Sequence, residues 1–79
     1  MVCYARVPLR RLIPTVQVHL ATDDGPVVFR ARWKRSPLEL HRSILFRLRQ
    51  GSLLWFEDEW GRALCFRPER VWGATVYGR

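Results

Sequence analysis

The strongest constraint on the fold is a stretch in which apolar and polar residues alternate on both sides of a turn signal. Residues 15–34 read TVQVHLATDDGPVVFRARWK, with the turn signal at Asp24-Gly25 and a proline directly after it. An antiparallel pairing centred there gathers apolar side chains on one side and polar side chains on the other, as a half-buried hairpin requires. The predicted pairs are Leu20–Phe29, Val18–Ala31 and Val16–Trp33 on the apolar side, and His19–Arg30 and Gln17–Arg32 on the polar side. We therefore predict a β-hairpin over residues 15–34.

A helix with marked ends is predicted for residues 36–50. Ser36 and Glu39 have the spacing of a capping box, Pro37 occupies the first helical position, and Gly51 supplies a left-handed end. At about 100° per residue, the residues expected to face the core share one arc about 160° wide. They are Leu38, Leu40, His41, Ile44, Leu45 and Leu48. Phe46 lies outside this arc, among charged side chains.

The segment after the helix, residues 52–77, is expected to form a β-meander. Two strands would pair across an acidic loop, and a third would return after the turn sequence RPER. Alternation is weak here, since Trp55 stands between Leu54 and Phe56. Such a pattern is typical of strands covered on both faces, and the second cover could be another subunit.

These elements have the order β-β-α-β-β-(β) and predict a small single α+β domain, with one helix packed on an antiparallel sheet. Residues 1–14 would form an N-terminal arm or an additional edge strand, because Pro8 and Pro14 are unsuited to a sheet centre. A chain of 79 residues buries only about 60–65% of the surface that it exposes when unfolded, so a single core leaves it marginally stable. We therefore expect a homo-oligomer.

The charge of the chain indicates the class of its partner. The formal net charge is +7, and Glu39 is the only acidic residue between residues 27 and 50. Such asymmetry attracts polyanions, so we predict a basic binding protein that contacts the backbone of RNA or DNA. The residues expected to contact nucleic acid are Arg30, Arg32, Lys34, Arg35, Arg42, Arg47 and Arg49, with Gln17 and His19 across the hairpin. On the strand, Arg30, Arg32 and Lys34 would form a row with intervals of about 6.5–7 Å.

The alternative is a protein-interaction or assembly subunit that does not bind nucleic acid. Aromatic side chains are frequent anchors of protein interfaces. The expected interface residues are Phe46, Trp55, Trp60 and Trp72. The sequence contains no RNA-recognition motif, GXXG loop or helix-turn-helix that would decide between the two functions.

Catalysis is not expected. His41 falls within the apolar arc of the helix, where a core histidine is favoured over a general base, and His19 has no carboxylate near it in the predicted hairpin. No Ser or Thr stands at a readable spacing from a His and an acid, and no glycine-rich loop could cradle a phosphate.

Cofactors and metal ions are not expected either. The chain has only two His and no CxxC pair, and adjacent acids in Glu57–Glu59 would point in opposite directions rather than converge on one ion. We expect Cys3 and Cys65 to be reduced. No apolar run approaches the about 18 residues of a membrane span, and a signal peptide is not recognisable. These features predict a cytoplasmic protein.

Overall fold

The computed structural model describes residues 13–78 of the chain. Its elements are β1 (Thr15–Thr22), β2 (Gly25–Arg32), α2 (Pro37–Gln50), β3 (Leu54–Glu57), β4 (Ala63–Phe66), the 3-10 turn η2 (Pro68–Arg70) and β5 (Val71–Tyr77). The predicted fold class is confirmed as a small α+β domain with antiparallel strand pairing and one α-helix within the described residues. Most of the predicted N-terminal arm, residues 1–12, lies outside the described residues.

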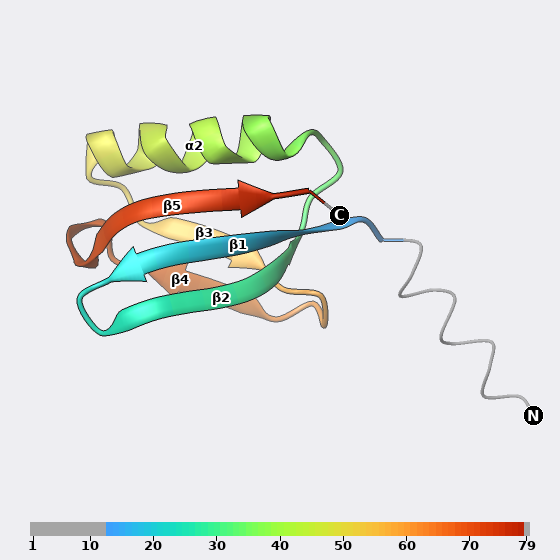
Figure 1. Cartoon of the computed structure of the whole chain (residues 1–79), viewed down its shortest axis with the longest axis horizontal. Helices are drawn as coiled ribbons and strands as arrows, with labels where there is room; N and C mark the ends of the chain where they lie inside the picture. Colours follow the sequence, from blue (N-terminus) through green and yellow to red (C-terminus); the bar gives the residue numbers. More distant parts are fainter. Residues whose placement is uncertain (1–12, 79) are drawn as a thin grey trace, which may run out of the picture.

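The strands form two sheets instead of the expected single one. The first has the order β2-β1-β5 and the second contains β3 and β4. The β3–β4 pair lies behind the three-stranded sheet, and α2 runs along one side of the two layers, next to β5 (Figure 1). The expected meander over residues 52–77 is therefore wrong, because β5 leaves the β3–β4 hairpin and pairs with β1. A buried central strand needs hydrogen-bonding partners on both edges, and β2 satisfies only one edge of β1.

The β1–β2 hairpin forms in a register two residues away from the predicted one. Leu20 pairs with Val27 and Val18 with Phe29. The faces are unchanged, since strand alternation has a period of two. The difference arises at the turn: Asp23 and Asp24 are the two turn residues, and Gly25, with φ +107°, is the first residue of β2 instead of the second turn residue. As a result β2 ends at Arg32, and the expected Val16–Trp33 pair does not form.

The core lies between the two sheets and beneath the helix. Its buried apolar residues are Val16, Val18, Leu20, Ala31, Leu40, Ile44, Leu54, Phe56 and Val71. Three aromatic rings join the sheets, with Phe56 in edge contact with Phe29 at 5.0 Å and with Phe66 at 6.0 Å between ring centroids. Truncating Phe56 would therefore loosen both layers together.

The helix begins and ends as predicted. Ser36 accepts a hydrogen bond from the Glu39 amide in a capping box, and Gly51 adopts a left-handed φ of 70°. The buried arc is narrower than predicted, because Leu38 and Leu45 are 55% and 37% exposed. The helix packs on the sandwich through Leu40 and Ile44, and its Leu38–Leu45 flank is left at the surface.

His41 lies on the β5 side of the helix. Its Nε2–H donates a hydrogen bond to the Ala74 carbonyl, with 3.1 Å between nitrogen and oxygen. The side chain is half-buried, as expected for a histidine bound within the fold. Within residues 13–78, the helix lacks the length and apolar character needed to cross a membrane.

Candidate nucleic-acid interface

Four arginines of the described residues are held in ion pairs by the chain's own carboxylates. The pairs are Arg32–Glu57 at 3.5 Å, Arg62–Asp58 at 2.8 Å, Arg67–Glu69 at 3.9 Å and Arg70–Asp24 at 3.6 Å. In each pair, the arginine lies in a strand or in a segment that connects two strands. The positive charge of the strands and their loops is therefore largely balanced locally.

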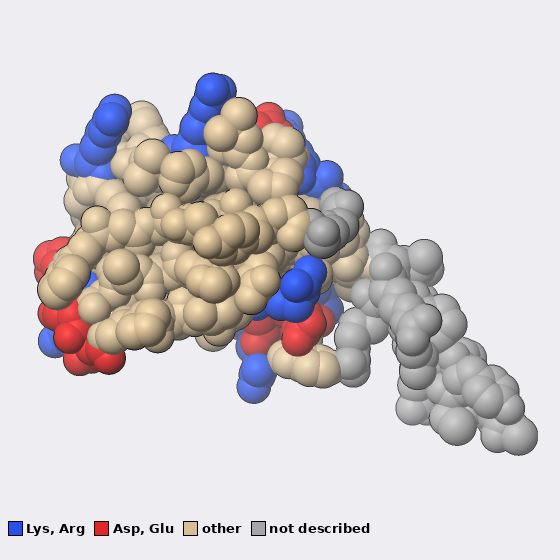
Figure 2. Space-filling view, in the orientation of Figure 1, with Lys and Arg blue, Asp and Glu red and all other residues tan. Residues whose placement is uncertain are grey.

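A second group of cations has no carboxylate partner among residues 13–78. Its five exposed members are Lys34, Arg35, Arg42, Arg47 and Arg49; Arg30 also lacks a carboxylate partner, but it is half-buried and donates to the Thr15 hydroxyl. We call these five residues the cationic surface. Glu39 is the single acid between residues 34 and 49, and it accepts a hydrogen bond from the Ser36 amide at 3.4 Å as part of the capping box. Figure 2 shows basic side chains projecting from the edge of the molecule where α2 lies.

Helix geometry orders part of the cationic surface. Arg42 and Arg49 are seven residues apart, which places them on the same helix face with about 10 Å between them along the axis. Phe46 lies between them on this face and is 60% exposed. Arg47 projects from another side of the helix. The pair Arg42–Arg49 therefore presents two cations on one helix face, with Phe46 between them.

The expected row of cations along β2 does not form. Arg30 donates from Nε to the Thr15 hydroxyl at 3.1 Å, and Arg32 turns towards the β3–β4 loop. Lys34 lies beyond the end of the strand. The physical reason is that Arg32 forms an ion pair with Glu57 of β3. The alternation of apolar and polar residues along β2 does not indicate that β3 lies close to it.

Gln17 and His19 lie on the outer face of the three-stranded sheet and not within the cationic surface. This outer sheet face comprises Thr15, Gln17, His19 and Ala21 of β1, Pro26, Val28, Arg30 and Arg32 of β2, and Gly73, Thr75 and Tyr77 of β5. The His19 ring meets the Tyr77 ring edge to face at 4.8 Å. Apart from Arg30 and Arg32 of the edge strand β2, these residues carry no fixed charge, and the face is mostly free of charged side chains in Figure 2.

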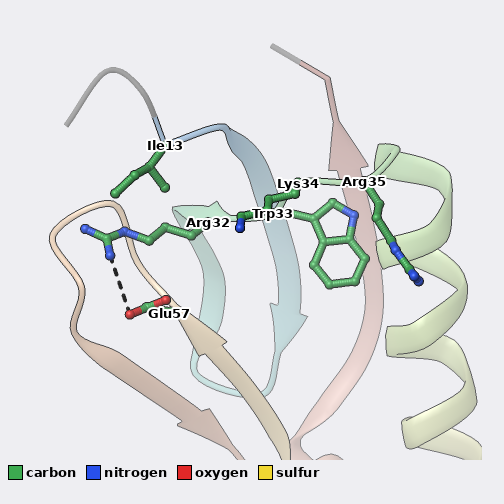
Figure 3. A pocket seen from close by; sticks show the side chains of 6 residues that line it. All are labelled: Ile13, Arg32, Trp33, Lys34, Arg35 and Glu57. Atoms are coloured by element: carbon green, nitrogen blue, oxygen red, sulfur yellow. Dashed lines mark ion pairs between the residues drawn. The ribbon is translucent and has the colours of Figure 1, made fainter. Parts of the chain in front are cut away.

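A hollow of about 580 Å³ opens at the end of β2. It is lined by Ile13, Arg32, Trp33, Lys34, Arg35 and Glu57 (Figure 3). The Trp33 indole donates from Nε1 to the Ser36 carbonyl at 2.8 Å, and the Trp33 amide donates to the Pro14 carbonyl at 3.0 Å. These bonds hold the ring in one orientation. Trp33 is half-buried and packs against the core, in agreement with the inward side predicted for it, and it also lines the hollow.

The acidic β3–β4 loop is built around Asp58, which is only 5% exposed. Its Oδ1 accepts hydrogen bonds from the amides of Trp60 and Arg62 at 2.9 and 2.8 Å, and Arg62 Nε donates to Oδ2 at 2.8 Å. Burial raises the pKa of Asp58, but the hydrogen bonds from Arg62 and Trp60, together with the Arg62 charge, hold it below its ordinary value. Asp58 is thus a buried acid at the start of the β3–β4 loop, with its carboxylate satisfied by the loop itself.

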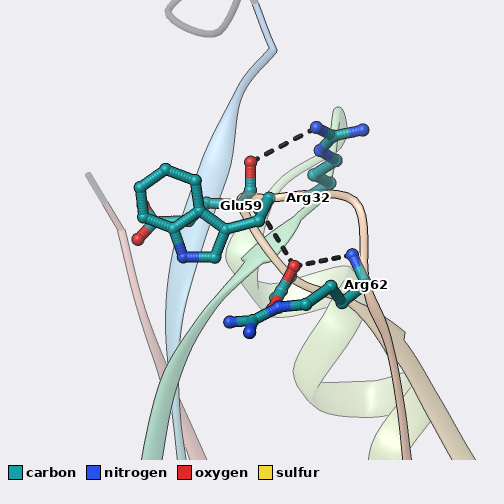
Figure 4. A network of polar contacts seen from close by, with 5 residues as sticks. Arg32, Glu59 and Arg62 are labelled. Carbon is teal, nitrogen blue, oxygen red and sulfur yellow. Dashed lines mark hydrogen bonds and ion pairs between the residues drawn. The ribbon is translucent and has the colours of Figure 1, made fainter.

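The same loop receives Arg32 from the other sheet. Arg32 Nη2 donates to the Glu59 carbonyl at 3.2 Å, while Arg62 binds within the loop itself (Figure 4). No group of three or more metal-ligating side chains occurs in the described part of the chain. The Arg32–Glu59 hydrogen bond thus connects the three-stranded sheet to the β3–β4 loop.

The four expected interface aromatics are all exposed, and they come from α2, β3, the β3–β4 loop and β5. Phe46 lies on α2 and Trp72 at the start of β5, with exposures of 60% and 73%. Trp55 and Trp60 lie on β3 and in the β3–β4 loop, with exposures of 59% and 51%. Cys65 is free and exposed, whereas Cys3 lies outside the described residues.

Comparison of the chain with protein-family models, curated proteins and solved structures gives no significant match.

Proposed function

We propose that this protein binds nucleic acid through contacts between the cationic surface and backbone phosphates. The observation that carries the proposal is the segregation of charge. Four arginines have carboxylate partners, whereas Lys34, Arg35 and the three helix arginines have none among the described residues. Exposed cations without internal partners are those free to replace the counterions of a polyanion.

Arginine suits this role because its planar guanidinium can donate two parallel hydrogen bonds to a phosphate. Backbone contacts of this kind supply affinity and carry no sequence information directly. We propose binding, without chemistry on the nucleic acid, as the activity.

The proposal is tested with two double variants of equal charge. Arg42→Gln with Arg49→Gln removes two cations from the cationic surface, and Arg67→Gln with Arg70→Gln removes two cations that have carboxylate partners. We expect the first variant to bind RNA and DNA oligonucleotides more weakly and the second to bind nearly as the wild type does. Equal losses in both variants would show that only total charge matters, and no binding by the wild type would refute the proposal.

A second candidate function is self-association through the outer sheet face. Val28 and Tyr77 on this face are both 51% exposed, and its charged residues among those described, Arg30 and Arg32, both lie on the edge strand β2, where Arg32 is paired with Glu57. Copies that each carry a net charge of +7 repel one another at their cationic surfaces, but they can meet at this face without bringing those cations together. The occupant that fits is therefore a second copy of this chain.

Sedimentation at increasing protein concentration tests this candidate. Val28→Lys with Tyr77→Lys should shift the equilibrium to monomer. The control pair, Leu53→Lys with Trp55→Lys, adds the same charge at exposed apolar sites elsewhere and should leave it unchanged. A monomeric wild-type protein, or dissociation by both pairs alike, would refute self-association through this face.

A further inference from the structure

We propose that the hollow beside Trp33 is a subsite for one unpaired base and its phosphate, and that it makes the protein prefer single-stranded nucleic acid over duplex. This inference rests on the proposed function and assigns a ligand class to a second part of the same surface. It begins from the fixed position of the indole ring. Hydrogen bonds from the Trp33 ring to Ser36 and from its amide to Pro14 anchor the residue at both ends.

The surroundings of the ring are asymmetric in charge. Figure 3 shows Lys34 and Arg35 on the two sides of Trp33, and the Arg32–Glu57 ion pair across the hollow. Lys34 and Arg35 have no carboxylate partner among residues 13–78, whereas Arg32 is balanced by Glu57. An apolar ring beside two unpaired cations is the combination that single-strand binding proteins present to a base and its phosphate.

The size of the hollow also favours a single nucleotide unit. Its volume of about 580 Å³ lies within the range of about 300–1,000 Å³ typical of small-ligand sites. The faces of paired bases are covered by their neighbours in a duplex, so an intact duplex cannot stack a base on Trp33. A single strand can turn one base onto the ring while its phosphates contact Lys34, Arg35 and the helix.

The Glu57 carboxylate would compete with a bound phosphate for Arg32. It holds Arg32 through one long ion pair of 3.5 Å, and the Glu57 side chain is 55% exposed. Arg32 Nε is buried without a hydrogen-bond partner, so the β3–β4 loop does not satisfy this side chain fully. Removing the Glu57 charge would leave Arg32 free to attract a bound phosphate.

The first test compares variants at position 33 by fluorescence anisotropy with a labelled oligodeoxyadenylate of about ten nucleotides, alone and annealed to its complement. Trp33→Leu should weaken binding of the single strand by at least about fivefold and leave duplex binding nearly unchanged. Trp33→Phe, which keeps a ring, should restore most of the loss. Trp55→Leu makes the same change at an indole that is 59% exposed on the other sheet and should have no effect.

The second test does not depend on the folding of a Trp33 variant. Glu57→Gln should strengthen single-strand binding about threefold, the effect of removing one repulsive charge about 7 Å from a phosphate in water. Glu69→Gln removes the same charge beside Arg67 and serves as the matched control. No gain with Glu57→Gln, or an equal gain with both variants, would overturn the subsite.

The outcomes separate this inference from the proposed function. Suppose that Trp33→Leu leaves single-strand affinity unchanged, or weakens single-strand and duplex binding equally, while the Arg42 and Arg49 substitutions still weaken both. The hollow is then not a base subsite, and backbone binding stands. If the wild type binds neither form, both proposals are wrong.

Discussion

Truncation of Phe56 tests whether the two sheets share one core. Phe56 is 8% exposed and contacts the rings of Phe29 and Phe66, so it touches both layers. Replacing a buried phenylalanine by alanine removes its transfer free energy and leaves a cavity, at a combined cost of about 3–5 kcal/mol. A domain of 79 residues has a total stability of about 4–12 kcal/mol. Phe56→Ala should therefore remove a large part of the free energy of unfolding.

The assay is urea unfolding followed by circular dichroism, with two controls. Phe56→Leu keeps most of the volume and should cost less than about 1.5 kcal/mol. Phe46→Ala makes the same change at a ring that is 60% exposed and should stay within about 0.5 kcal/mol of the wild type. A loss below about 1 kcal/mol for Phe56→Ala would show that the β3–β4 sheet does not pack on the three-stranded sheet.

Three further predictions concern the turns and the helix start. Because hydrogen bonds hold the pKa of Asp58 below its ordinary value of 3.8, ionised Asp58 stabilises the fold above that pH, and the stabilisation is lost as the pH falls through the lowered value. Urea midpoints of Asp58→Asn should therefore depend less on pH in this acidic range than those of the wild type. Gly25→Ala places a side chain at φ +107° and should cost at least about 1 kcal/mol by urea unfolding. Ser36→Ala removes the helix cap and should cost about 0.5–2 kcal/mol in the same assay, whereas an unchanged midpoint would contradict the capping box.

Local signals were sufficient to predict the helix ends. The capping box and the glycine stop act over a few residues, and each functions in the structure as the sequence suggested. The faces of the hairpin were also predictable, because alternation assigns every residue to a side. The register was not, since a shift of two residues leaves every side chain on its face and only the conformation of Gly25 decides between the two pairings.

The sheet arrangement and the charge distribution depend on contacts between distant parts of the chain. The β5 strand pairs with β1 across about fifty residues of sequence, and a register shift beside Trp72 interrupts the alternation that could have indicated its faces. Arg32 and Glu57 meet only because the β3–β4 loop folds against the end of β2. The sequence therefore predicted which residues are cationic, but not which of them are neutralised.

The salt dependence of binding tests most directly whether cations without carboxylate partners contact the phosphates. If Lys34, Arg35, Arg42 and Arg49 neutralise four phosphates of duplex DNA, the logarithm of the binding constant should fall against the logarithm of salt concentration with a slope of about −3.6. Arg42→Gln with Arg49→Gln should reduce the magnitude of this slope by about 1.8, while Arg67→Gln with Arg70→Gln should leave it unchanged. A wild-type affinity that is independent of salt, or the same reduction in both double variants, would contradict this interpretation.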